Sequence, residues 1–256
     1  MRVKAVIAAR MGSTRLERKM LLDLHGIPLL GHSVRRALWL PEITETEDIV
    51  LAIPESAEND VLDEFGHMLD LNVFRGSEEN VLSRIIGAGD LVNADVIYRI
   101  TPDNPLVDPG VVGETFREFN SGDWDYAAME DTPLGTAAEI VRVSALKEAQ
   151  NLATESGNEK FIEHPTLALY ENSDLFRMKL VPCPDKWRRP GWRFTVDTEA
   201  DFSFVRSIMD ELGIDATLDT IVPYIDSKPE LLEINAGISQ KGWDSLKERK
   251  DSIRNV

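Results

Sequence analysis

The chain has 256 residues, with 45 acidic and 28 basic side chains and a formal net charge of −17. This length suffices for one large α/β domain, and an apolar share of 43% can fill its core. The acidity argues against general binding of nucleic acids or anionic membranes, which depends on basic patches. We expect a cytoplasmic protein, because the first nine residues lack a secretory signal and no apolar stretch is long enough to span a membrane.

Strand and helix patterns alternate through the first half of the chain. Strands are predicted at residues 3–9, 49–53, 72–74, 96–100 and 126–129, and helices at residues 29–40, 59–69, 79–91 and 109–120. This alternation is typical of a mostly parallel sheet flanked by helices. Asn59 and Asp108 are the predicted N-caps of the second and fourth helices.

After residue 130 the alternation breaks, and proline and glycine become frequent. Helices are predicted at residues 144–153, 160–170 and 199–212, extended segments at 180–181 and 193–196, and helical turns from residue 222 onward. We expect a single domain over residues 1–256, with an elaborated acceptor or dimerisation region at about 130–192. Cys183, the only cysteine, cannot form a disulfide within one chain and is predicted to be structural.

A small, basic, flexible segment follows the first predicted strand. It contains Arg10, Gly12, Ser13, Arg15 and Lys19. Guanidinium, ammonium and hydroxyl groups bind phosphate oxygens, and a glycine lets the backbone approach an anion closely. The pattern favours a loop that binds a nucleoside triphosphate, although a solvated turn has a similar composition.

Two aspartates follow later strands in the same way. Asp103 comes just after the strand at 96–100, and Asp197 just after the extended segment at 193–196. Ligands of open α/β sheets bind beyond the carboxyl ends of strands, so both aspartates and the basic loop are predicted to converge on one crevice. Taken singly, Asp103 suits a turn and Asp197 a helix start. Together with the loop they favour a site for Mg²⁺ bound to a triphosphate.

Five blocks of sequence resemble a known family. They read AARMGSTRLERKML, DLHGIPLL, VFRGSEENVLSR, RITPDNPLVDP and WRFTVDTEADF. In this order they resemble the cytidylyltransferases of the spore coat polysaccharide biosynthesis type, which are related to CMP-3-deoxy-octulosonate and CMP-sialic acid synthetases. The resemblance implies a GT-A-like, Rossmann-like nucleotidyltransferase fold with Mg²⁺ as cofactor, and a homodimer. It also implies transfer of CMP from CTP to a sugar acid or a sugar or polyol phosphate, with pyrophosphate release, in surface glycan synthesis.

The resemblance also assigns roles to the residues that match the family's motifs. The nucleotide loop is matched by Arg10, Ser13, Arg15 and Lys19, and the acidic, metal-associated positions are matched by Asp103 and Asp197. Lys19, Asp103 and Asp197 are therefore the predicted catalytic residues. The family loop usually reads Arg-Leu-Pro-Gly-Lys, and this chain has Glu17 and Arg18 in place of proline and glycine.

The residues that would hold the acceptor are less sharply marked. Glu139, His164 and Arg193 are the acceptor-binding candidates, each with a structural role as the alternative. The block KWRRPGWR at residues 186–193 suits either an acceptor clamp or a surface loop. The sequence leaves open whether a hydroxyl or a phosphate is the nucleophile.

Two other classes of function remain possible from the sequence. One is a noncatalytic nucleotide-binding regulatory protein on the same fold, which the altered loop at Glu17 and Arg18 suggests. The other is a nucleotide-sugar glycosyltransferase, for which we expect a close Asp-x-Asp pair that is absent from the predicted strand ends. The presence of both Asp103 and Asp197 favours catalysis.

Overall fold

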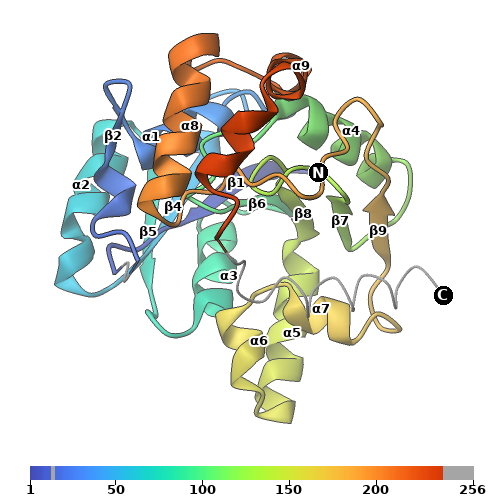
Figure 1. The fold of residues 1–256 in the computed structure, drawn as a ribbon. Helices are drawn as coiled ribbons and strands as arrows, with labels where there is room; N and C mark the ends of the chain where they lie inside the picture. The colour runs from blue at the N-terminus through green and yellow to red at the C-terminus, as the bar shows by residue number, and fades with distance from the viewer. Residues whose placement is uncertain (13–14, 239–256) are drawn as a thin grey trace.

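The computed structural model describes residues 1–12 and 15–238, and a seven-stranded sheet runs through it (Figure 1). The strand order is β5-β4-β1-β6-β8-β7-β9. Only β8 runs antiparallel to the other strands of this sheet. The strands are β1 (Val3–Ala8), β4 (Ile49–Pro54), β5 (Asn72–Gly76), β6 (Val96–Ile100), β7 (Tyr126–Met129), β8 (Glu139–Arg142) and β9 (Met178–Val181). The prediction of a mostly parallel sheet flanked by helices is confirmed.

The central strands are apolar on both faces because helices cover both faces. β1 pairs with β4 on one side and with β6 on the other, and all six residues of β4 are buried. Near-continuous apolar runs are expected of strands in this position. The carboxyl ends of β1, β4 and β6 therefore lie together at one edge of the sheet, where the basic loop and Asp103 begin.

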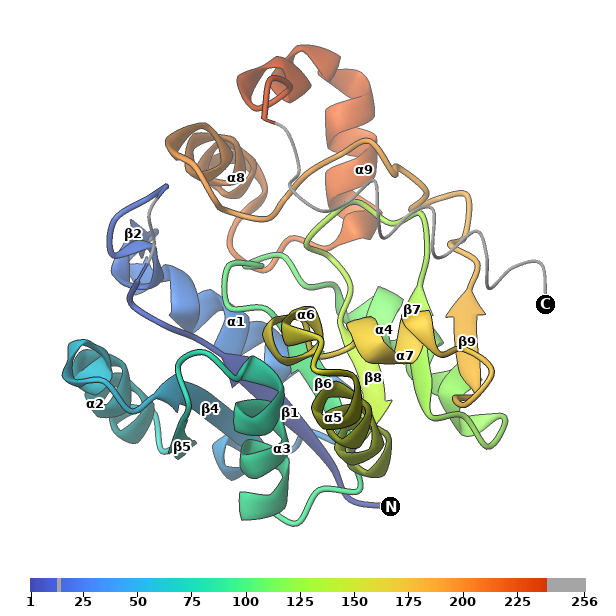
Figure 2. The same cartoon turned by 90° about the horizontal axis from the view of Figure 1, so that it is seen from below.

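Helices form a layer on each face of the sheet. One face packs against α1 (Leu29–Ala37), α2 (Asp60–Met68) and α4 (Pro109–Asn120). The other packs against α3 (Val81–Leu91), α5 (Val143–Ser156), α6 (Glu159–Glu163) and α7 (Leu167–Glu171). Figure 2 shows α3 and α5 in front of the strands when the molecule is seen from below.

A third apolar cluster joins the end of the described chain to the sheet. It contains side chains of α8 (Glu199–Leu212) and α9 (Leu218–Ser227), and the 3-10 helix η4 (Pro229–Ile234) packs against it. The shorter elements are η1 (Lys19–Leu21), β2 (Asp23–Leu24), β3 (Ile27–Pro28), η2 (Thr46–Asp48) and η3 (Ala57–Asn59). Of the helical turns predicted from residue 222 onward, those beyond residue 238 lie outside the described residues.

Three local predictions differ from the structure. The helix predicted at 160–170 is split into α6 and α7 at Pro165, which lacks an N–H and disfavours helical backbone at the residue before it. The segment predicted as extended at 193–196 makes only one isolated bridge, between Arg193 and Leu134. Asn59 does not cap α2 with its side chain, whereas Asp108 caps α4 as predicted, with Pro109 in the first turn.

None of the helices in the described ranges combines the length and apolarity needed to cross a bilayer.

Candidate active site

The basic loop leaves the sheet after β1 and is held by a buried asparagine. The Met11 backbone N–H donates to Asn59 Oδ1 at 2.9 Å, and Asn59 Nδ2 donates to Ser56 Oγ at 2.8 Å. Asn59 is fully buried, so its amide fixes the path of the loop, a role that sequence reasoning missed. Arg10 and Gly12 are exposed along this path, and Ser13 lies outside the described residues.

The end of the loop turns sharply to bring Lys19 inside. Arg18 has a left-handed backbone, with φ of 51° and ψ of 29°, immediately before η1. Glycine adopts this conformation without the steric cost that a side chain incurs. The position therefore accounts for the glycine that the resembled family usually has there. Glu17 is exposed, which keeps its charge at the surface.

Lys19 joins the two predicted acidic positions. Its Nζ lies 2.8 Å from Asp103 Oδ2 and 2.9 Å from Asp197 Oδ1, and it donates to the Val196 carbonyl at 3.1 Å. Lys19 is only 9% exposed. Burial acts against its charge, but the two carboxylates outweigh burial and raise the pKa of Lys19 above its usual value.

The loop that carries Asp103 is fixed from beneath by α1. Ser33 Oγ donates to the Pro102 carbonyl at 2.9 Å, and the buried Arg36 donates through Nε to the Pro105 carbonyl at 3.2 Å. The Val196 N–H donates to the Asp103 carbonyl at 2.9 Å. The two aspartate segments, far apart in sequence, are thus hydrogen-bonded to each other beyond β6.

Asp197 is surrounded by cations. In addition to Lys19, Arg15 lies 2.8 Å from its Oδ1 and Arg193 lies 2.7 Å from its Oδ2. Burial raises the pKa of this carboxyl, but Lys19, Arg15 and Arg193 outweigh burial and hold the pKa below its usual value. The structure thus brings Arg15, Lys19, Asp103 and Asp197 together, as the sequence predicted. Arg193, predicted to bind the acceptor, joins them as an ion-pair partner of Asp197.

Asp201 supports this cluster from behind and was not predicted. It is fully buried and accepts from Arg193 Nε at 2.9 Å and from the Asp197 N–H at 3.1 Å. It also forms a capping box with Thr198 at the start of α8. The Thr-x-x-Asp spacing is a sequence signature of that box and is the signal that could have found Asp201.

The acceptor candidates Glu139 and His164 make no contact with Asp103 or Asp197 among the interactions of the described residues. Glu139 pairs with Arg99 in the register of β6 and β8, and accepts from Tyr126 Oη at 2.7 Å. Burial opposes its charge, but Arg99 and these hydrogen bonds hold the pKa of Glu139 below its usual value. His164 is exposed at the end of α6.

The block at residues 186–193 docks α9 onto the fold. Lys186 Nζ and Trp187 Nε1 both reach Asp219 Oδ1, at 3.0 and 2.8 Å. Arg189 pairs with Asp226. These contacts give residues 186–189 a structural role, in line with the surface-loop alternative, whereas Arg193 at the end of the block pairs with Asp197.

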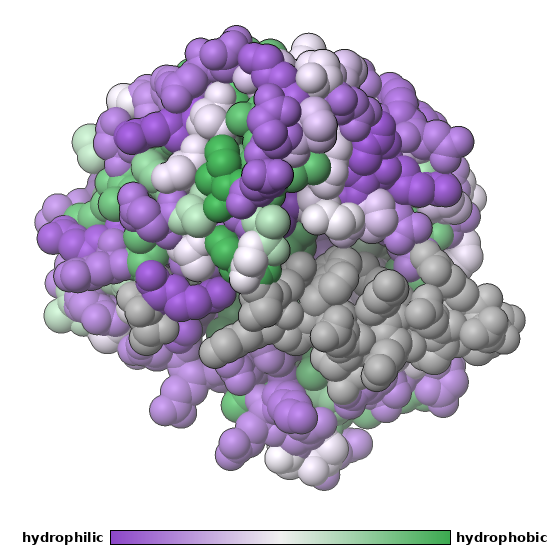
Figure 3. Space-filling view, viewed as in Figure 1, coloured by the Kyte–Doolittle hydropathy of each residue, from purple (hydrophilic) through white to green (hydrophobic). Residues whose placement is uncertain are grey.

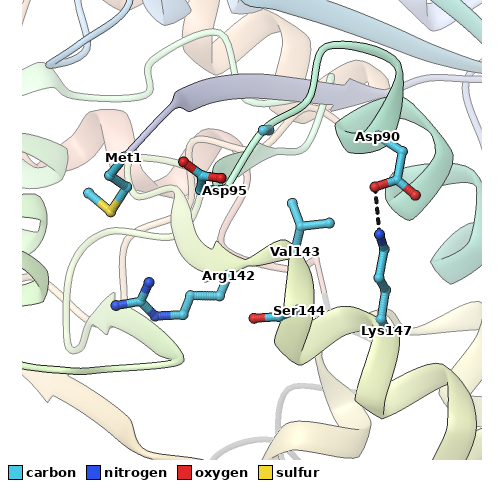
Figure 4. A pocket seen from close by; sticks show the side chains of 8 residues that line it. Met1, Asp90, Asp95, Arg142, Val143, Ser144 and Lys147 are labelled. Atoms are coloured by element: carbon cyan, nitrogen blue, oxygen red, sulfur yellow. Dashed lines mark hydrogen bonds and ion pairs between the residues drawn. The ribbon is translucent and has the colours of Figure 1, made fainter.

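A separate pocket lies at the opposite edge of the sheet (Figure 4). It has a volume of about 450 Å³ and lies at the amino ends of β1 and β6, and Asp95 and Arg142 are among the residues that line it. Lys147 points toward Asp90 and pairs with it at 2.7 Å. This pocket is therefore distinct from the cluster around Lys19.

The described residues on the face shown in Figure 3 are mostly hydrophilic, with a short hydrophobic strip over the region of α8 and η4. This agrees with the net charge of −17. The cations around Asp197 are a local exception within an acidic molecule.

Asp103 and Asp197 supply oxygen donors of the kind that Mg²⁺ prefers. Carboxylate oxygens of Asp103 and Asp197 converge on the Lys19 ammonium, and their side chains are 21% and 17% exposed. Mg²⁺ is commonly bound by one or two carboxylates together with substrate phosphates and water. Within the described ranges there is no group of three or more His, Cys, Asp or Glu side chains placed to hold a metal ion. Two carboxylates suit a metal that substrate phosphates and water also bind, and Mg²⁺ at this place stays a prediction.

A basic loop follows β1, one carboxylate lies beyond the end of β6, and a second lies in the segment before α8. This arrangement at the carboxyl ends of the strands suits an α/β protein that binds an anionic ligand such as a nucleotide. The model of the cytidylyltransferase family matches residues 4–231, and the chain belongs to this family. It is accordingly an enzyme of the nucleotidyltransferase type, and the resemblance inferred from the sequence is confirmed.

Known relatives agree with the family assignment. The spore coat polysaccharide biosynthesis protein SpsF of Bacillus subtilis is 29% identical, over 88% of this chain and 94% of its own length. The structure of a cytidylyltransferase from Leptospira borgpetersenii is 25% identical, with a TM-score of 0.81 over 94% of this chain and 100% of that chain. A CMP-2-keto-3-deoxy-manno-octonic acid synthetase in complex with CTP shares the fold. It has a TM-score of 0.59 at 19% identity and covers 82% of this chain and 99% of its own.

Proposed function

We propose that the enzyme transfers CMP from CTP to a sugar acid, or to a sugar or polyol phosphate, and releases pyrophosphate. The observation that carries the proposal is the convergence of Arg15, Lys19 and Arg193 on the carboxylates of Asp103 and Asp197. Cations next to metal-binding carboxylates are what a reaction at a triphosphate requires, because charge on the phosphate oxygens must be neutralised.

Each residue has a definite role in this proposal. Arg10, Arg15 and Lys19 bind the triphosphate and stabilise the pyrophosphate as it leaves. Asp103 and Asp197 would hold Mg²⁺, which when bound neutralises charge on the phosphate oxygens. Arg193 keeps the Asp197 carboxylate in place through its contact at 2.7 Å.

The relatives support the choice of donor and the class of pathway. A synthetase with the same fold forms a complex with CTP, and a relative along most of the chain acts in spore coat polysaccharide biosynthesis. We extend the proposal to synthesis of a surface polysaccharide. Glu139 and His164 remain acceptor-binding predictions, as do the homodimer and the cytoplasmic location.

A turnover assay tests the proposal. Pyrophosphate release is measured with each of the four nucleoside triphosphates, with and without Mg²⁺, against 3-deoxy-octulosonic acid, nonulosonic acids, and sugar and polyol phosphates. We expect release with CTP, with Mg²⁺ and with one class of acceptor. Preference for another nucleotide would contradict the choice of CTP, and a lack of CTP binding by calorimetry would contradict the nucleotide site.

A further inference from the structure

Behind Asp197 lies a hydrogen-bonded chain that ends outside the region matched by the family model. Asn235 follows η4 and lies four residues beyond Leu231, where the match ends. It is 7% exposed, and its single side-chain nitrogen Nδ2 donates to the Arg193 carbonyl and to Asp201 Oδ1, both at 3.1 Å.

We propose that Asn235 is a positioning residue for the Asp197 carboxylate and acts through Arg193 and Asp201. The inference rests on the proposed function, in which Asp197 binds metal and nucleotide. Asn235 touches neither Asp197 nor Lys19 in the contacts of the described residues, so its effect is indirect.

The first hydrogen bonds in this series hold Arg193 at two points. Its main-chain carbonyl accepts from Asn235, and its Nε donates to Asp201 Oδ1 at 2.9 Å. With both points held, the outer guanidinium nitrogen lies 2.7 Å from Asp197 Oδ2. Removing the Asn235 amide takes away one of these two hydrogen bonds and leaves the bridge to Leu134 to hold the backbone at Arg193.

The second step fixes Asp201. The carboxylate of Asp201 is fully buried, and its Oδ1 accepts hydrogen bonds from Asn235 and Arg193. Its Oδ2 accepts hydrogen bonds from the backbone N–H groups of Asp197 and Thr198 at 3.1 and 3.0 Å. A buried carboxylate needs its donors, because an unmet acceptor in the interior is costly. Without Asn235, Asp201 loses one donor and holds the Asp197 backbone less firmly.

The element that carries Asn235 is anchored independently of the site. Leu231 and Leu232 of η4 pack against the apolar cluster of α8 and α9. The amide therefore comes from a fixed turn, and the end of the described chain contributes to the geometry of a site built at the strand ends. Groups that hydrogen-bond directly to metal ligands typically change metal affinity about 10-fold to 100-fold when removed, and Asn235, one contact further away, should have a smaller effect.

The test measures binding of Mn²⁺ in the presence of CTP by electron paramagnetic resonance, together with thermal unfolding. For Asn235→Ala we expect Mn²⁺ affinity to fall measurably, by up to about 10-fold. For Asn235→Asp we expect a larger fall, because a second buried carboxylate would face Asp201 and the Arg193 carbonyl. Asn235→Ser retains one donor and is expected to fall between the wild type and Asn235→Ala, which keeps the series informative if another variant does not fold.

The matched control is Asn72→Ala. Asn72 Nδ2 donates to the Glu47 carbonyl at 2.7 Å, at the amino end of the edge strand β5 and away from the cluster around Lys19. Its removal should leave Mn²⁺ affinity unchanged. Wild-type affinity in a folded Asn235→Ala protein would overturn the inference alone. A wild-type protein that binds neither CTP nor Mn²⁺ with CTP would contradict the proposed function, and the inference with it.

Discussion

Replacing Lys19 by methionine tests the site at its most connected side chain. The substitution keeps the length and apolar stem of Lys19 and removes two ion pairs, at 2.8 and 2.9 Å, from a side chain that is 11% exposed. Loss of one group that stabilises developing charge costs about 2.7–4 kcal/mol, so kcat should fall about 10²-fold to 10³-fold.

Stability should fall by less than in a fully buried ion pair. Breaking such a pair costs about 3–5 kcal/mol, but both carboxylates here keep some contact with solvent, and Asp197 keeps Arg15 and Arg193. We expect a loss of about 1–3 kcal/mol in the free energy of unfolding. Lys19→Arg keeps the positive charge but replaces the compact ammonium with a planar guanidinium. We expect its stability to lie closer to the wild-type value than its kcat does.

The assays are pyrophosphate release at saturating CTP and equilibrium unfolding in urea. Lys147→Met is the control, since Lys147 pairs with Asp90 at 2.7 Å with both side chains about half exposed. It should change stability by no more than about 1 kcal/mol and leave turnover unchanged. Wild-type or faster turnover by Lys19→Met would refute the catalytic role, because Lys19 would then only screen the two carboxylates.

Three further predictions follow from local geometry and charge. Arg18→Gly should stabilise the protein by about 0.5–1 kcal/mol in urea unfolding, because it relieves the left-handed backbone; a loss of stability would contradict this. The depressed pKa of Asp197 should contribute stability that is present above its ordinary pKa of 3.8 and lost as the pH falls through the lower folded value. Asp197→Asn should therefore unfold with a weaker dependence on acid pH than the wild type, and an unchanged dependence would count against the ion pairs. Burial raises the pKa of the Cys183 thiol to about 11, so iodoacetamide should label it only after unfolding; rapid labelling of the folded protein would be inconsistent with its burial.

The parts of the site that follow strands could be predicted from sequence. A continuous apolar run marks a strand buried on both faces, and polar residues just after it mark the edge where ligands bind. This is why Lys19 and Asp103 could be placed together although they are far apart in the chain. The 84 residues between Lys19 and Asp103 are bridged because β1 and β6 are neighbours in the sheet. Asp197, 178 residues from Lys19, follows no strand and is held at the site by the hydrogen bond from the Val196 N–H to the Asp103 carbonyl.

The parts that depend on a single hydrogen bond could not be predicted in the same way. Asn59 has the sequence of a helix cap, but its amide holds the loop at Met11 instead. β8 was missed because its four residues Glu139–Arg142 are too few to show a clear alternation and run directly into α5 at Val143. Asn235 carries no local pattern at all, since its partners are 34 and 42 residues away.

The central claim is that Asp103 and Asp197 form a catalytic centre with Lys19. The most direct measurement compares Mg²⁺-dependent pyrophosphate release from CTP in the wild type, Asp103→Asn and Asp197→Asn, with Asp215→Asn as control. Asp215 is an exposed partner of Arg35 at 2.6 Å. We predict that each active-site variant stays folded and loses at least about 10²-fold in kcat, while the control keeps full activity. Full activity in either active-site variant would contradict the role of that aspartate.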